Sequence, residues 1–191
     1  MAWNPFGVAF EVSASSTSVT RTSATQYTVK IKAAWETYYS GAETNYGMKA
    51  SSGGGSVVLN PSGTYASSGS GSFTGTYSIS GNGSASKTIT VTFTNYIEDW
   101  QGNVTDSKTT TVTFNVTVPA WTSYKVSYNA NGGSGAPSSQ TKWKDQTLTL
   151  SSTKPTRTGY TFKGWSTSST ATSATYSAGG SYTANSATTL Y

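Results

Sequence analysis

The side chains of this sequence that could do chemistry are its carboxylates, amines and hydroxyls, and their pattern argues against catalysis. Among 191 residues there is no His and no Cys. The commonest general base, the commonest metal ligand and the thiolate nucleophile are therefore all missing. Without His, the many Ser residues cannot form a Ser–His–Asp triad. We expect no enzyme, no catalytic residue and no cofactor.

The seven carboxylates offer one further possibility, a cation site. Glu98 and Asp99 are adjacent and Asp106 follows closely. In a loop these oxygens could bind Ca²⁺, which prefers oxygen ligands, but the sequence has no Asp-x-Asp-x-Asp spacing. A glycosidase would need two carboxylates that face each other across a cleft. We interpret the three acids as solvated loop charges and expect no metal site.

The basic side chains are distributed unevenly along the chain. Residues 1–120 carry six basic and six acidic side chains, whereas residues 121–191 carry six basic side chains and one acidic side chain. The whole net charge of +5 therefore belongs to the second part. Such an excess favours an anionic polymer as ligand, for example wall teichoic acid or an acidic polysaccharide, with nucleic acid ranked lower.

A basic and aromatic cluster in the second part provides the candidate contact residues. Lys142, Trp143 and Lys144 are consecutive. The full candidate set for an anionic polymer or a glycan is Lys142, Trp143, Lys144, Lys154, Arg157 and Trp100. The alternative is a solubilising surface without a ligand, and the spread of the charges along the chain favours that alternative.

Alternating apolar and polar residues predict strands through the first 119 residues. In the clearest strand, 27–35, Tyr and Trp at the ends and Val, Ile and Ala between them share one face. Further strands are expected near 8–12, 46–50, 56–59, 73–79, 89–93 and 112–118. We expect a polar connector at Ser13–Ser18 and a Ser/Gly loop from Asn60 to about Gly71. No helical period occurs, so residues 1–119 are predicted to form an Ig-like antiparallel β-sandwich.

The second part has the same period-2 pattern with tighter turns. Alternation through 124–128 and 160–164 predicts two strands, and a Gly/Asn-rich run at 129–135 predicts a sharp turn between strands. Trp165 follows Gly164, an arrangement that suits close backbone packing. We interpret Trp165 as a core residue, with a sugar-stacking platform as the alternative.

These motifs carry a specific resemblance. The order V-x-Y-x-A-N-G-G-x-G-A-P, then L-T-L, then P-T-R-x-G-Y-x-F-x-G-W and finally T-L-Y is similar to the internalin-type B repeat, or Listeria–Bacteroides repeat, over 124–191. The resemblance implies a small β-grasp-like module of secreted, wall-attached or phage tail proteins, without catalytic residues. Members usually continue past T-L-Y, so a truncated last strand at Tyr191 is left open.

The predicted organisation is all-β: a sandwich at 1–119, a short linker at 120–123 and the repeat-like module at 124–191. No apolar run is long enough to cross a membrane, so membrane insertion is not expected. The whole chain resembles modular tail proteins of phages and prophages of Gram-positive bacteria. This implies a virion or extracellular location, and a structural or host-surface-binding role.

The expected partners are a bacterial cell-surface glycan, an anionic wall polymer or other virion proteins, and homo-oligomers are possible. A wall-attached adhesin or spacer, and the carbohydrate-binding part of a wall hydrolase, are the alternatives.

Overall fold

The computed structural model describes residues 2–3, 9–37, 47–60, 68–99 and 101–191, and its regular elements are all β-strands. The chain divides into two compact units, Met1–Ala120 and Trp121–Tyr191. Among the described residues, no helix is long and apolar enough to cross a membrane. The predicted all-β class, with a β-sandwich before a small β module, is confirmed; the Ig-like relationship stays a prediction.

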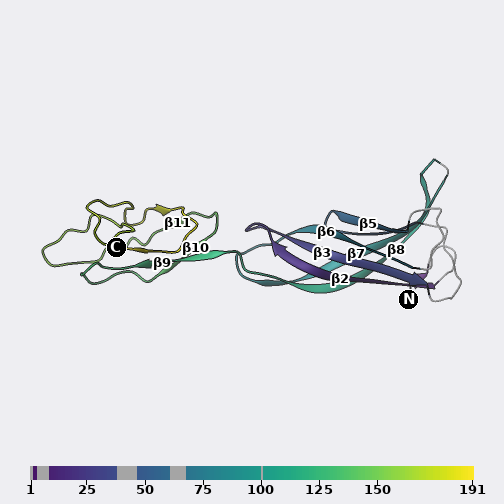
Figure 1. Cartoon of the computed structure of the whole chain (residues 1–191), viewed down its shortest axis with the longest axis horizontal. Coiled ribbons are helices and arrows are strands. Elements are labelled where there is room, and N and C mark those ends of the chain that lie inside the picture. The colour runs from purple at the N-terminus through teal and green to yellow at the C-terminus, as the bar shows by residue number, and fades with distance from the viewer. Residues whose placement is uncertain (1, 4–8, 38–46, 61–67, 100) are drawn as a thin grey trace. The chain divides into compact units, whose positions relative to one another are not determined.

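The first unit consists of two four-stranded antiparallel sheets (Figure 1). One sheet has the order β1-β2-β3-β6, and its strands are Ala2–Trp3, Ala9–Arg21, Gln26–Thr37 and Ser68–Ser78. The other has the order β5-β4-β7-β8, and its strands are Gly55–Asn60, Gly47–Ser52, Ala85–Glu98 and Val104–Val118.

The alternation predicted for β3 and β7 decides which face of each sheet is buried. On β3, Val29 and Ile31 are fully buried, whereas Lys30 and Lys32 face solvent. On β7, Val91 belongs to the same core cluster as these β3 residues. The apolar faces of the two sheets therefore pack against each other, which is how a sandwich removes apolar area from water.

Two segments expected as loops are strands. Ser13–Ser18 lies within β2, and Ser68–Gly71 begins β6; residues 61–67 lie outside the described part. The Ser/Thr side chains of β2 face solvent, so this part of the strand forms without alternating apolar residues. In β6 the glycines permit close approach, because a Cβ on Gly71 would lie 2.6 Å from Val57.

Arg21 is a buried cation whose guanidinium donates only to backbone carbonyls. Nη1 donates to Gly83 and Pro119, Nη2 to Ala24 and Gly81, and Nε to Ser23. These carbonyls belong to the turn after β2, the turn after β6 and the end of β8. One side chain therefore ties together three segments at one end of the sandwich, using the five donors of a guanidinium.

Replacing Arg21 with Met should destabilise the first unit. The Arg21→Met variant would leave five carbonyls without their donor, and we expect a loss of about 2–4 kcal/mol in the free energy of unfolding. Urea unfolding followed by circular dichroism measures this loss. The control is Lys32→Met on the exposed face of β3, which should change stability by less than about 0.5 kcal/mol. Equal effects of both variants would show that Arg21 does not hold these turns.

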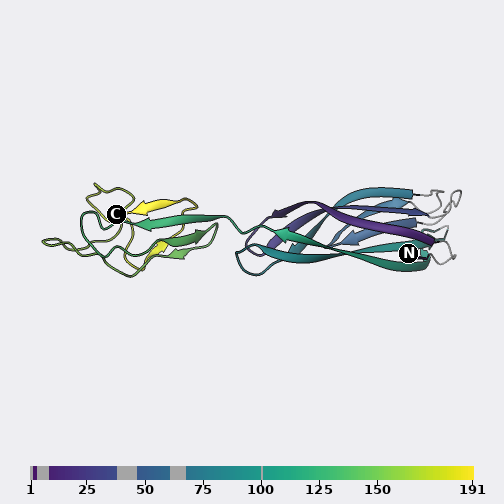
Figure 2. The ribbon, with the colours of Figure 1, turned by 90° about the horizontal axis from the view of Figure 1, so that it is seen from below.

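The second unit combines a three-stranded and a two-stranded sheet. The first has the order β10-β9-β13, and its strands are Gln140–Trp143, Ser123–Tyr128 and Thr188–Leu190. The second pairs β11 (Leu148–Thr149) with β12 (Ser181–Tyr182). Strand β13 runs parallel to β9, and their arrows point the same way in Figure 2.

Trp165 lies at the centre of the second core. Its side chain is fully buried, and the rings of Tyr128 and Phe162 pack on it at centroid distances of 4.9 and 5.0 Å. The interpretation of Trp165 as a core residue is therefore confirmed. The strand expected at 160–164 does not form; only an isolated bridge joins Trp165 to Tyr176.

The unit boundary falls just before Trp121, inside the segment predicted as a linker. The Trp121 indole nitrogen donates to the Lys144 carbonyl at 2.9 Å, and the Thr122 carbonyl accepts from the Lys144 amide at 2.9 Å. The Trp121 side chain is buried. Trp121 and Thr122 therefore both contact the second unit.

Candidate functional site

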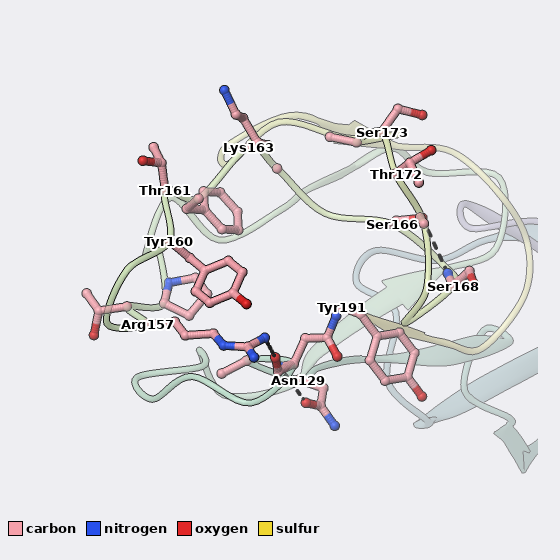
Figure 3. Close-up of a pocket in the computed structure, with 18 residues that line it drawn as sticks. Asn129, Arg157, Tyr160, Thr161, Lys163, Ser166, Ser168, Thr172, Ser173 and Tyr191 are labelled. Carbon is pink, nitrogen blue, oxygen red and sulfur yellow. Dashed lines mark hydrogen bonds between the residues drawn. The ribbon is translucent and has the colours of Figure 1, made fainter.

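The second unit contains a cavity of about 330 Å³, which is at the lower end of the range for small-ligand pockets (Figure 3). Three stretches that are distant in sequence form its walls, together with Tyr191: 129–131, 155–164 and 166–174. Its polar lining consists of hydroxyl and amide side chains and two cations, with no Asp or Glu among them. Phe162 and two Tyr rings add apolar surface.

The guanidinium of Arg157 is held in place at one wall. Its Nη1 donates to the Asn131 carbonyl at 2.9 Å, and its Cζ lies 4.1 Å from the centroid of the Tyr160 ring. Gly132 lies against it, because a Cβ there would be 3.3 Å from Cζ. A guanidinium fixed by a carbonyl and a ring keeps donors for a carboxylate or phosphate and loses little entropy on binding.

The turn that supplies these contacts is the predicted Gly/Asn-rich run. Asn131 and Gly132 have φ of 48° and 86°. This left-handed geometry is accessible to Asn and Gly at low cost. The Asn131 amide group donates to the Ser169 carbonyl at 2.8 Å, which joins the turn to the opposite wall. The predicted sharp turn is therefore confirmed, and it also shapes the cavity.

The opposite wall depends on Ser166 and Tyr191, whose backbones exchange two hydrogen bonds of 3.0 and 2.8 Å. The Ser166 hydroxyl accepts from the Ser168 amide at 3.3 Å. Figure 3 shows the rings of Tyr160 and Tyr191 on two sides of the cavity, with Lys163 directed outward at the rim. Two rings that flank hydroxyl and amide groups suit a sugar, whose faces stack on rings and whose hydroxyls need hydrogen bonds.

The sequence-predicted contact residues are dispersed. Lys142 was expected at the surface, and this is wrong: its side chain is fully buried on the inner face of β10. Trp143 and Lys144 are half-buried, and the Lys144 ammonium lies 5.4 Å from the Trp121 ring centroid. Lys154 is exposed and does not line the cavity, whereas Arg157 does. Trp100 lies outside the described residues.

The residues that sequence reasoning missed are Tyr160, Tyr191 and the Asn and Ser side chains of the cavity. Tyr160 was assigned to the apolar face of a strand, but no strand forms there and its side chain is 67% exposed. An exposed Tyr next to Arg in a Gly-containing turn is the signal that could have identified it.

Asp99 behaves as the predicted loop charge. Its carboxylate accepts hydrogen bonds from the Asn103 side chain and from the backbone amides of Gln101 and Asn103. The Asn103 side-chain hydrogen bond is the main reason that the pKa of Asp99 is lowered. For Glu98 and Asp106 the loop prediction is wrong, because Glu98 ends strand β7 and Asp106 lies on strand β8; their side chains are outside the described part. The described residues contain no cluster of three metal-ligating side chains.

Gly164 and Trp165 connect the cavity wall to the core. Gly164 has φ of 141°, and a Cβ there would lie 2.6 Å from the Tyr176 carbonyl oxygen. The Trp165 amide donates to that same carbonyl at 2.7 Å. The close approach that the sequence predicted for this glycine is therefore present.

Replacing Gly164 with Ala should destabilise the second unit by about 2–4 kcal/mol, from strained φ and steric overlap together. The matched control is Gly159→Ala, where φ is 80° but no atom lies within 4 Å of the added Cβ. Only the left-handed strain remains there, about 1 kcal/mol. Thermal unfolding of both variants compares the two costs, and a Gly159→Ala loss as large as that of Gly164→Ala would contradict the packing argument.

Comparisons with known proteins agree with part of this picture. Neither the curated proteins nor the solved structures contain a match to this chain. A family model does match: residues 124–191, which include strands β10 to β13 and nearly all of β9, correspond to the Listeria-Bacteroides repeat domain. The resemblance predicted for these residues is confirmed, and the cavity lies entirely within the matched repeat domain.

Proposed function

We propose that this chain is a non-enzymatic surface-binding part of an extracellular or virion protein, most simply a phage or prophage tail. In this proposal the second unit binds an anionic, sugar-containing polymer of the bacterial wall, and the first unit is a structural support. The observation that carries the proposal is the cavity at Arg157, where a positioned guanidinium, two tyrosine rings and several hydroxyl groups converge.

The charge of the second unit supports an anionic ligand. Six basic side chains stand against one acidic side chain in 121–191, and none of the residues that line the cavity is acidic. A repeating anionic polymer would be attracted to the whole unit and held specifically at Arg157. The absence of His and Cys from the sequence supports binding without catalysis.

The matched repeat domain and the tail-protein resemblance support the proposed location. The structural role of the first unit is supported by its two packed sheets. In a tail, such a unit would hold the binding module against the rest of the assembly.

Binding should depend on the cavity more than on charge alone. Arg157→Met and Lys154→Met each remove one positive charge from the exposed segment 153–158. We expect Arg157→Met to weaken binding to purified Gram-positive cell walls about tenfold, because it removes a charge-assisted contact. Lys154→Met should bind nearly as the unaltered chain does, because Lys154 does not line the cavity.

The measurement is depletion of the protein from solution by increasing amounts of wall, at low and at high salt. Binding should fall as salt rises and on walls stripped of teichoic acid, because screening weakens charge pairs. Equal loss in the two variants would assign binding to general charge. No binding by the unaltered chain would reject the proposal in favour of a purely architectural role.

A further inference from the structure

Three side chains of complementary chemistry meet beside β10, outside the cavity. Lys142 lies on β10, Asp145 follows that strand in a tight turn, and Asn185 precedes β13. The Lys142 amine (Nζ) is 3.1 Å from the Asn185 amide oxygen, and the Asn185 amide nitrogen is 2.7 Å from an Asp145 carboxylate oxygen. The amine therefore contacts the primary amide, and the primary amide contacts the carboxyl group.

The amine is buried without a carboxylate partner. The Lys142 side chain has no exposed surface, and Nζ donates to two carbonyl oxygens, those of Trp143 and of the Asn185 side chain. No ion pair joins it to any carboxylate in the described part of the chain. Lysine is rarely buried completely without an opposite charge, because burying an unpaired charge is costly. An amide nitrogen, which carries no charge, would avoid that cost at this position.

The amide is oriented by the backbone of Asp145 as well as by its side chain. The Asp145 amide donates to the Asn185 side-chain oxygen at 2.9 Å, and Asp145 has φ of 58°. This left-handed residue directs both its N–H and its carboxyl group at the same side chain, 40 residues away. The N–H is placed where a backbone donor would stabilise negative charge on that oxygen.

We propose that Lys142 and Asn185 join spontaneously in an amide cross-link, with Asp145 as the catalytic residue. Lys142 first loses its ammonium proton to solvent. The Nζ lone pair then attacks Cγ of Asn185, and the oxygen becomes negative beside the Asp145 N–H.

Collapse of this intermediate breaks the Cγ–Nδ2 bond. The Asp145 carboxyl group transfers one proton from the attacking nitrogen to the departing nitrogen, which leaves as ammonia. One C–N bond forms and one breaks, and no oxidant or reductant is needed. Asp145 and Asn185 are exposed, so ammonia can reach solvent directly.

The cross-link would replace a buried amine by a buried amide, and an amide carries no charge to desolvate. It would connect β10 covalently to the segment that leads into β13, the two strands that flank β9. The alternative is that Lys142 is an uncrosslinked cation held by two carbonyl oxygens. This inference does not depend on the binding function.

Intact-mass spectrometry of the full chain tests the proposal. We expect a mass lower than the sequence mass by one ammonia, about 17 Da. Tryptic digestion should yield one branched peptide that contains both Lys142 and Asn185, with no cleavage after Lys142. An unmodified mass after prolonged incubation, with normal cleavage after Lys142, would overturn the proposal.

Two variants separate the cross-link from other losses of ammonia. Lys142→Met removes the nucleophile with similar volume, and Lys144→Met is the matched control in the turn that directly follows β10. Lys142→Met should show the full mass of its own sequence. Lys144→Met should still show a mass lower by one ammonia. A succinimide at Asn185 would also lose ammonia, but it would persist in Lys142→Met, and that result would overturn the proposal.

The Asp145→Asn variant tests the proton transfer, because Asn keeps the left-handed backbone accessible while removing the acid. We expect the cross-link to form about a hundredfold more slowly in this variant, as measured by the time course of the mass change after refolding. Formation at an unchanged rate would remove Asp145 from the reaction.

Discussion

Burial of the Trp165 indole is the constraint on which the second unit depends. The ring fills the centre of a small core, and the backbone on either side is committed to other segments: Gly164 approaches Tyr176, and Ser166 pairs with Tyr191. The cavity lies directly outside these contacts. Its walls include loops without regular strands, so their positions are set by how this one aromatic side chain is packed.

The two buried basic side chains in the described part of the chain have their nitrogens placed in the same unusual way. Arg21 donates to five backbone carbonyls, and Lys142 donates to two carbonyl oxygens, one of them from a side chain. Neither has a carboxylate within ion-pair distance in the described part of the chain. A sequence with only seven acids has few carboxylates for such positions, and neutral oxygens take their place. Removing either side chain would deprive backbone carbonyl oxygens of a donor, five of them at Arg21 and that of Trp143 at Lys142.

The local sequence pattern predicted those strands in which apolar and polar residues alternate. Strands β3, β7 and β8 were evident, because apolar residues alternate with Lys and Thr along them. The Ser/Thr part of β2 was not evident, because hydroxyl side chains are similarly acceptable in a loop and on the exposed face of a strand. The glycines that begin β6 suggested a loop. In the structure they are required because β5 approaches β6 closely, and this contact between distant segments has no local sequence signal.

The candidate site was less predictable for the same reason. Arg157 was named from its charge, but Tyr160 and Tyr191 become neighbours of the cavity only through the fold. Lys142 looked like a surface residue because its neighbours Trp143 and Lys144 suggested a basic patch. Its partner Asn185 is 43 residues away, and no local pattern relates the two. Charge and composition indicate which residues are chemically suited to contact a ligand. Burial in the folded chain then determines which of these residues a ligand can reach.

The parallel pairing of β9 with β13 has a mechanical consequence. The second unit begins at β9 and its last strand is β13, and the two lie side by side with the same direction. A pulling force applied at the start of β9 and at the end of β13 would slide the strands along each other. All the hydrogen bonds between them would then bear the load together, instead of opening one after another from an end. A unit connected in this way resists tension along its strands.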